Sequence, residues 1–352
     1  MSRRTLYVVV PGDIDSRTGG YGYDRAIIAG LGARGWDVRL VSLPGEYPFP
    51  TLSEQEQAAS LLASIPDGAC VMVDGLALGV LPDVAAREHD RLRLLGLVHH
   101  PLGLETGLDP FVAQLLIATE QEALRHVRGV VVTSPGTVEA VVELGVLPEH
   151  VAVVEPGTAH AQVAAGSGDG VPHLLCVASL TPRKGHDTLV DALERLQHLP
   201  WRLTCVGGFD RHSAYATHLR ERVAAGPLAG RVALVGELAG AALDAAYHSA
   251  DLFVLATRYE GYGMVVAEAL ARALPVVSTP TGAIPDLIGE GAGVLVPADD
   301  AAALADALAR LLSDSAVLQR LRDGAGRVRS SLRTWETAAA GMEDAVVRFT
   351  GA

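Results

Sequence analysis

Short apolar runs rich in β-branched residues alternate with helical patterns along the first part of the chain. Glycine-bearing turns bound the runs, as is typical of buried strands in a parallel sheet. We predict strands at residues 6–10, 38–42, 70–73, 94–98, 130–133 and 151–154, separated by helices at 24–33, 53–64, 110–125 and 137–144. This alternation predicts an α/β, doubly wound sheet.

The same alternation starts again after residue 170. We predict strands at 174–178, 203–206, 232–235, 252–256, 276–278 and 293–296, and helices at 187–196, 214–225, 240–248, 264–272, 284–289 and 301–312. A last helical pattern covers 335–349. Two Rossmann-like sheets are therefore expected, with a working site in the cleft at the carboxyl ends of their strands.

The boundary between the two predicted domains lies in a stretch without apolar periodicity. Residues 161–170 (AQVAAGSGDG) are mostly small, and we expect them to form a flexible linker. We predict an acceptor-side domain at 1–165 and a donor domain at 166–330, with the helix at about 331–352 packing back on the first domain.

Composition narrows the class of protein. The 352 residues carry 28 basic and 41 acidic side chains, a net charge of −13 that argues against nucleic-acid binding. Lys184 is the only lysine. Cys70, Cys176 and Cys205 lie in apolar runs without metal-ligand spacing, so we expect buried, reduced thiols in a cytoplasmic protein. We expect neither a signal peptide nor stable membrane insertion.

The segment 260–268 (EGYGMVVAE) carries the most informative candidate chemistry. It follows a predicted strand and opens a helix, so Gly261 and Gly263 free the backbone for a phosphate at the helix start. Glu268 on that helix is suited to accept hydrogen bonds from ribose hydroxyls. The alternative is one carboxylate at a helix cap and one on the surface.

In each predicted domain, one further loop of interest follows the first strand. Residues 181–185 (TPRKG) place Lys184 at the carboxyl edge of the second sheet, where a cation suits a leaving diphosphate. Residues 18–22 (TGGYG) precede the first helix, and their glycines allow a phosphate or sugar to approach the backbone. Each loop alone is also compatible with an ordinary surface turn.

Together these loops resemble family 4 glycosyltransferases, which are retaining enzymes of the GT-B fold that use sugar nucleotides. The resemblance includes 281–286 (TGAIPD), 291–297 (GAGVLVP) and 155–158 (EPGT), and it is dense over about 172–300. It implies a hexosyltransferase that moves a sugar from a nucleoside-diphosphate donor, with a UDP-sugar expected, to an acceptor hydroxyl.

The resemblance implies a role for each matched residue. The catalytic set would be Glu260 near the donor sugar, Lys184 on the diphosphate and His99 beside the reacting sugar. Glu268 would bind the ribose hydroxyls. The remaining donor-binding positions are Gly19, Gly20, Ser179, Arg183, Arg211, Gly236, Glu237, Gly261, Tyr262, Gly263, Met264 and Val265. His99, His100 and Glu105 would lie on the acceptor side.

One departure from the family pattern concerns the leaving diphosphate. Relatives carry an arginine five residues before the lysine, where this chain has Ser179. Arg183 and Arg211 are the candidates to replace its charge. The family also implies that neither a metal nor another cofactor is needed, and we interpret Asp13 and Asp15 as polar loop residues rather than metal ligands.

Several alternatives stay open from the sequence. A sugar-nucleotide 2-epimerase shares the two-domain fold, and a nicotinamide-dependent oxidoreductase is suggested by Gly20 and Gly22, although Arg25 stands where helix packing requires glycine. An exported ligand-binding protein and a phosphorylase with pyridoxal phosphate on Lys184 are further rivals. For a transferase we expect a small soluble metabolite or saccharide as acceptor, because no basic amphipathic helix is apparent.

Overall fold

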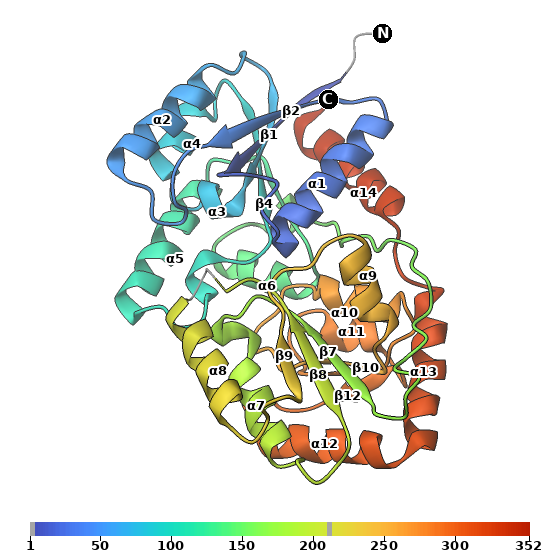
Figure 1. Ribbon diagram of the computed structural model, residues 1–352. Coiled ribbons are helices and arrows are strands. Elements are labelled where there is room, and N and C mark those ends of the chain that lie inside the picture. Colours follow the sequence, from blue (N-terminus) through green and yellow to red (C-terminus); the bar gives the residue numbers. More distant parts are fainter. Residues whose placement is uncertain (1–3, 210–212) are drawn as a thin grey trace. The chain divides into compact units, whose positions relative to one another are not determined.

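Two parallel sheets, each with its own helices, organise the part of the chain that the structure describes (Figure 1). The structure is a computed structural model that describes residues 4–209 and 213–352. Unit 1 comprises Met1–Gly157 with Arg333–Ala352, and unit 2 comprises Thr158–Leu332. The predicted fold class, two doubly wound parallel sheets, is confirmed.

The sheet of unit 1 has the order β2-β1-β3-β4-β5-β6, with parallel pairing throughout. Its strands are β1 (Thr5–Pro11), β2 (Asp37–Leu43), β3 (Cys70–Asp74), β4 (Arg93–Val98), β5 (Gly129–Val132) and β6 (Val151–Val153). The interior strands β3 and β5 are buried along their whole length, which explains their almost entirely apolar sequences.

The helices of unit 1 are mostly where the apolar periodicity places them. They are α1 (Gly19–Ala33), α2 (Leu52–Ala63), α3 (Gly75–Leu78), α4 (Pro82–Glu88), α5 (Pro110–Leu124), α6 (Gly136–Glu143) and α14 (Trp335–Thr350), with 3-10 turns η1 (Leu102–Leu104) and η2 (Pro148–His150). The short helices α3 and α4, of four and seven residues, were not predicted.

Helix α1 begins earlier than predicted. The side chain of Thr18 accepts a hydrogen bond of 3.1 Å from the Tyr21 backbone N–H, which caps the helix at Gly19 instead of Asp24. The expected Gly19–Gly20 loop is therefore the first turn of a helix. The cap outweighs the low helix propensity of the two glycines.

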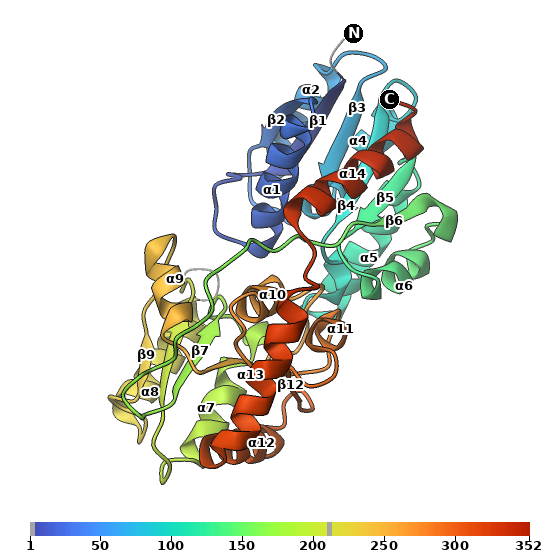
Figure 2. The same ribbon diagram turned by 90° about the vertical axis from the view of Figure 1, so that its right-hand side faces the viewer.

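Helix α14 belongs to unit 1 and packs along α1, as both views show (Figure 2). A Cβ on Gly30 of α1 would come within 2.5 Å of the Ala339 Cβ, so the two helices approach through small residues. Met342 and Val346 of α14 are fully buried.

The sheet of unit 2 has the order β12-β11-β10-β7-β8-β9, again with parallel pairing. Its strands are β7 (His173–Val177), β8 (Arg202–Val206), β9 (Val232–Leu234), β10 (Leu252–Leu255), β11 (Val276–Ser278) and β12 (Gly293–Leu295). The neighbours β7 and β10 lie at the centre, so the loops that follow them emerge at one edge.

The helices of unit 2 alternate with these strands. They are α7 (His186–Glu194), α8 (Ser213–Ala225), α9 (Ala241–His248), α10 (Met264–Leu270), α11 (Ile284–Ile288), α12 (Ala301–Ser313) and α13 (Ser315–Arg329), with the 3-10 turn η3 (Pro182–Lys184). Helix α13 was not predicted; its sequence is mostly polar, and its buried residues are Val317, Gly324 and Ala325.

The expected flexible linker at 161–170 is instead fixed to unit 2. The backbone N–H groups of Ala164 and Ala165 donate to the carbonyls of Arg272 and His248, at 2.9 and 2.8 Å. The Ser167 N–H donates to the Asp251 carboxylate. Small side chains here allow close backbone contact with the unit, which explains a composition that resembles a linker.

No helix in residues 4–209 and 213–352 has both the length and the apolar character required to cross a membrane.

Candidate active site

Lys184 and Glu260 form an ion pair in unit 2. Lys184 ends the turn η3 after β7, and Glu260 lies in the loop after β10. Because β7 and β10 are paired and parallel, both loops leave the sheet at its carboxyl edge. The two side chains are only 15% and 12% exposed, so the pair is partly shielded from solvent.

Two glycines allow the backbone of these loops to pack closely. Gly185 has φ +65°, and a Cβ there would lie 1.8 Å from the Ala256 carbonyl oxygen. Gly282 has φ +54°, and its Cβ would lie 1.9 Å from the carbonyl oxygen of Glu260. Both positions therefore require glycine, and both fix the backbone beside the ion pair.

Arg258 was not predicted as a site residue, yet it joins three segments around Lys184. Its guanidinium donates to the carboxylates of Asp187 and Asp299 at 2.9 and 2.7 Å, and to the Pro182 carbonyl. Burial alone would raise the pKa of Asp187, but Arg258 holds it below its usual value. Asp187 lies 71 positions away in the sequence, so no local pattern could reveal this contact.

Arg183, a candidate to replace the missing arginine charge, donates to the Tyr259 carbonyl at 3.0 Å. Ser179 lies in the loop between β7 and η3, where its carbonyl accepts the N–H of Thr181. The other candidate, Arg211, lies outside the described residues.

Glu268 is held on α10 by a tyrosine. The Tyr247 hydroxyl donates a 2.9 Å hydrogen bond to Glu268 Oε2, and the Arg272 guanidinium stacks 4.3 Å from the centre of the Tyr247 ring. Burial raises the pKa of Glu268, while the Tyr247 hydrogen bond acts in the opposite direction. Tyr247 and Arg272, neither of which was predicted, thus orient the predicted Glu268 carboxylate.

The turn between the two glutamates starts α10. Gly263 has φ +90°, and its carbonyl accepts the N–H groups of Val266 and Ala267. Tyr262 is buried and packs with Ala267 and Ala283, whereas Gly261, Met264 and Val265 are half-buried.

Gly236 and Glu237 follow β9 and lie beside the loop that follows β8. The Gly236 carbonyl accepts the Gly207 N–H at 2.9 Å. A Cβ on Gly208 would lie 2.7 Å from Glu237 Oε1, so that carboxylate covers Gly208. The structure thus places two of the predicted donor-binding residues, Gly236 and Glu237, beside the loop that follows β8.

His99 in unit 1 directs Nε2 toward two buried carboxylates. Asp24 Oδ1 lies 3.0 Å and Asp74 Oδ2 3.6 Å from this nitrogen. Burial favours the neutral ring, but the charges of Asp24 and Asp74 outweigh it and raise the pKa of His99. Burial raises the pKa of Asp74 to about 7, against the opposing charge of His99. Neither aspartate was predicted, because Asp24 lies in α1 and Asp74 ends β3, and no local pattern connects these elements.

The other predicted residues of unit 1 surround His99 or follow it. A Cβ on Gly20 would meet the His99 ring at 3.4 Å, an ordinary contact, and one on Gly19 would meet no other described atom within 4 Å. Packing within unit 1 therefore requires neither glycine. His100 is half-buried, and Glu105 is exposed and accepts the Thr106 N–H at 3.0 Å.

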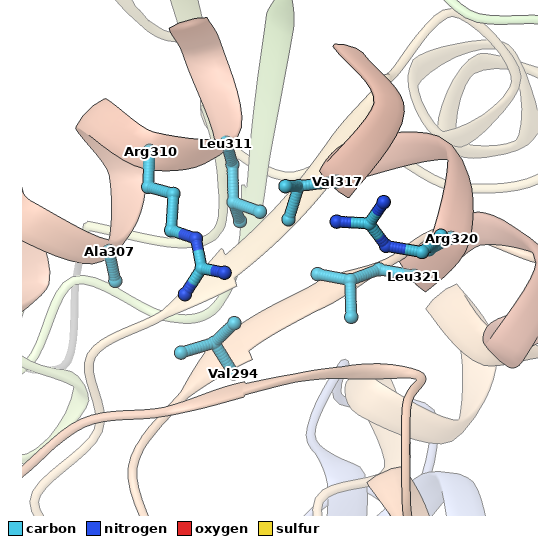
Figure 3. A pocket seen from close by; sticks show the side chains of 7 residues that line it. All are labelled: Val294, Ala307, Arg310, Leu311, Val317, Arg320 and Leu321. Atoms are coloured by element: carbon cyan, nitrogen blue, oxygen red, sulfur yellow. The ribbon is translucent and has the colours of Figure 1, made fainter. Parts of the chain in front are cut away.

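A hollow of about 270 Å³ lies elsewhere in unit 2 (Figure 3). Apolar side chains of β12, α12 and α13 line it, with the guanidinium groups of Arg310 and Arg320 on either side. No residue of the predicted donor set lines this hollow, as far as the described residues show.

The comparisons with known proteins agree with the motifs of unit 2. Residues 171–314 match the family model described as glycosyl transferases group 1. The chain is 36% identical over 147 residues to the lipopolysaccharide core biosynthesis mannosyltransferase LpsB of Rhizobium meliloti, covering 40% of this chain and 41% of LpsB. It is 32% identical over 177 residues to a GDP-mannose-dependent alpha-(1-6)-phosphatidylinositol monomannoside mannosyltransferase of Mycobacterium tuberculosis, covering 47% and 43%. The chain thus spans less than half the length of these relatives.

Solved structures resemble the whole chain. A sucrose-phosphate synthase from Thermosynechococcus elongatus matches with a TM-score of 0.82 and 22% identity over 97% of this chain and 98% of that one. Anabaena HepE in complex with UDP and glucose matches with a TM-score of 0.77 and 18% identity over 97% and 99%. At these identities the likeness shows the fold, which is the expected GT-B fold.

Proposed function

We propose, from the family match of residues 171–314, that the chain transfers a sugar from a nucleoside-diphosphate donor to an acceptor hydroxyl group. The Lys184–Glu260 ion pair is the observation that carries this proposal. It lies within the matched segment, and Glu268 follows on the adjoining helix.

The chemistry follows from where charge develops. The bond between the anomeric carbon and the diphosphate oxygen breaks, and the acceptor oxygen bonds to that carbon. Its proton passes to the departing phosphate. Lys184 stabilises the negative charge on the leaving diphosphate, and such a preorganised cation contributes about 3–4 kcal/mol to the transition state. Glu260 lies beside the donor sugar in this scheme.

The remaining groups position the donor and the acceptor. Glu268 binds the ribose hydroxyls, and the turn at Gly261–Gly263 lets the backbone approach the diphosphate. His99 acts near the reacting sugar, and the segment around His100 and Glu105 contacts the acceptor. We propose retention of configuration, without a metal ion or other cofactor, because Lys184 supplies the charge on the leaving side.

A UDP-sugar is our first candidate donor, as the family resemblance favours a uracil nucleotide. GDP-mannose is the second, because the relative from Mycobacterium tuberculosis is described as GDP-mannose-dependent. We propose a small soluble metabolite or a saccharide as acceptor. LpsB, by its name, acts in lipopolysaccharide core biosynthesis, which makes saccharides the first acceptors to assay.

Calorimetric titration with UDP, GDP, ADP and their sugars tests the proposal. We expect one nucleotide series to bind. Glu268→Ala weakens that binding by about tenfold or more because it removes hydrogen bonds to a charged group, and Tyr247→Phe weakens it less. Glu290→Ala, at an exposed glutamate of the same unit, is the matched control and binds like the wild type.

Two outcomes would overturn the proposal. It fails if no nucleotide binds and Glu268→Ala changes nothing. Conversion of the donor in the absence of any acceptor would indicate an epimerase instead, and a change in NAD(P)H fluorescence on titration would indicate an oxidoreductase.

A further inference from the structure

Three metal-ligand side chains meet in the core of unit 2, apart from the residues assigned to the donor. Cys176 on β7 and Cys205 on β8 are register partners, and His186 is the first residue of α7. All three are 1–2% exposed. Their ligand atoms lie within 4.8 Å of one another, and Cys176 Sγ lies 3.7 Å from His186 Nε2.

The polar atoms of this cluster are poorly satisfied. Within the described part of the chain, His186 Nδ1 is buried and has no hydrogen-bond partner. His186 Nε2 faces a thiol, which is a weak donor. Among the described residues, the buried His186 imidazole thus has one ring nitrogen without a partner and the other against a thiol.

We propose that Cys176, Cys205 and His186 bind a thiophilic divalent metal ion, such as Zn²⁺, through both Sγ atoms and His186 Nε2. Thiolate and imidazole are the donors that zinc prefers, and sites with three protein ligands include a Cys₂His set. Zinc bonds of about 2.3 Å to sulfur and about 2.0 Å to nitrogen place those two ligand atoms about 3.5–3.8 Å apart. The observed 3.7 Å between Cys176 Sγ and His186 Nε2 fits this separation.

Charge balance favours a divalent ion over a monovalent one. Binding replaces both thiol protons, which leave for solvent, so two thiolates neutralise the two positive charges of the ion. The apolar core then gains no net charge. A monovalent ion with two thiolates would leave a buried negative charge, which is costly.

The ion would connect the start of α7 to the two central strands β7 and β8. His186 follows Lys184 by two residues, so the same connection stiffens the end of the η3 loop. None of the three proposed metal ligands is among the residues assigned to the sugar donor. The metal site therefore does not depend on the proposed transferase activity.

Titration of the reduced, chelator-treated full chain with Cd²⁺ and Zn²⁺ tests this inference. With Cd²⁺ we expect thiolate-to-metal charge-transfer absorption that saturates at one equivalent and accompanies release of two protons per ion, read with an indicator dye. Cys176→Ser and Cys205→Ser abolish the band, and His186→Ala weakens binding. Cys70→Ser, at a buried cysteine of unit 1, leaves the band unchanged.

Zinc binding also raises the midpoint of thermal unfolding of the wild type but not of Cys176→Ser. Absence of the charge-transfer band in the folded wild type would overturn the inference, even if the variants failed to fold. So would a full-strength band in Cys176→Ser. A Cys176–Cys205 disulfide that forms in air, together with no metal binding by the reduced chain, would show an oxidation-sensitive thiol pair instead. Nucleotide binding is measured separately, so neither result decides the other.

Discussion

Lys184 and Glu260 form an ion pair across two loops that are 76 positions apart in the sequence. Each loop follows one of two paired central strands, and each contains or contacts a glycine whose Cβ would collide with backbone. The backbone of unit 2 thus fixes the ion pair at the carboxyl edge of its sheet. In the proposed reaction the diphosphate competes with Glu260 for the ammonium group.

Removing this ammonium group should remove most of the turnover. We expect Lys184→Ala to lower kcat by about 10²–10³-fold, because the leaving diphosphate loses its cation. Lys184→Arg should rescue poorly, since a planar fork differs in shape from a point charge. Steady-state kinetics, with circular dichroism to verify the fold, checks both.

The control for Lys184→Ala is Arg310→Ala, which removes an exposed cation from the hollow between α12 and α13. It should behave like the wild type. Full activity in Lys184→Ala would show that the donor site is assigned to the wrong loop.

Arg258 should support Lys184 without touching the donor. Its guanidinium holds η3, the first turn of α7 and the loop at Asp299 together. We expect Arg258→Ala to lower turnover by about tenfold or more, because the displaced Lys184 no longer meets the leaving group in the right geometry. Kinetics and the midpoint of thermal unfolding are the measurements.

Arg222→Ala is the matched control for Arg258→Ala. Arg222 also binds carboxylates of α7, Asp191 and Glu194, but on turns beyond the Lys184 loop. It should lose little activity. If the two variants lose the same activity, Arg258 stabilises α7 in general and does not position Lys184.

Local sequence patterns were sufficient for the strands and for the residues that lie in motifs. Glu268 lies in a predicted helix and Lys184 in the loop between a predicted strand and a predicted helix, so a short window identifies both. Arg258 and Asp24 act through partners that are 71 and 75 positions away, and only the fold shows those contacts. The start of α1 was placed wrongly because the Thr18 cap outweighs the glycines that follow it.

The cluster of Asp24, Asp74 and His99 should make the stability of unit 1 depend on pH. Asp74 loses its proton near pH 4 when unfolded but only at about pH 7 when folded. The native state therefore holds more protons in this interval, and the free energy of unfolding falls as the pH rises through it. The raised pKa of His99 acts in the same direction at pH values above its unfolded pKa.

Asp74→Asn should flatten that fall between about pH 4 and pH 7. Hydrogen exchange of β3 amides in urea, measured over a pH series, reports unit 1 alone. Asp83→Asn, at an exposed aspartate of α4, should keep the wild-type slope. An Asp74→Asn profile as steep as the wild type would contradict the assigned proton.

Gly185, beside Lys184, should not tolerate a side chain. Gly185→Ala places a Cβ 1.8 Å from the Ala256 carbonyl oxygen and forces an L-residue to φ +65°. The backbone strain alone costs about 1–2 kcal/mol, and the collision adds to it by displacing β10 or the Lys184 loop.

Gly230→Ala separates the two effects, because Gly230 has φ +77° but its Cβ meets no described atom within 4 Å. We expect chemical denaturation to show a loss in Gly230→Ala that matches the strain alone. Gly185→Ala should lose more stability and also turnover. Equal losses of stability in the two variants would contradict this prediction, because they would show that the extra Cβ at residue 185 adds nothing to the backbone strain.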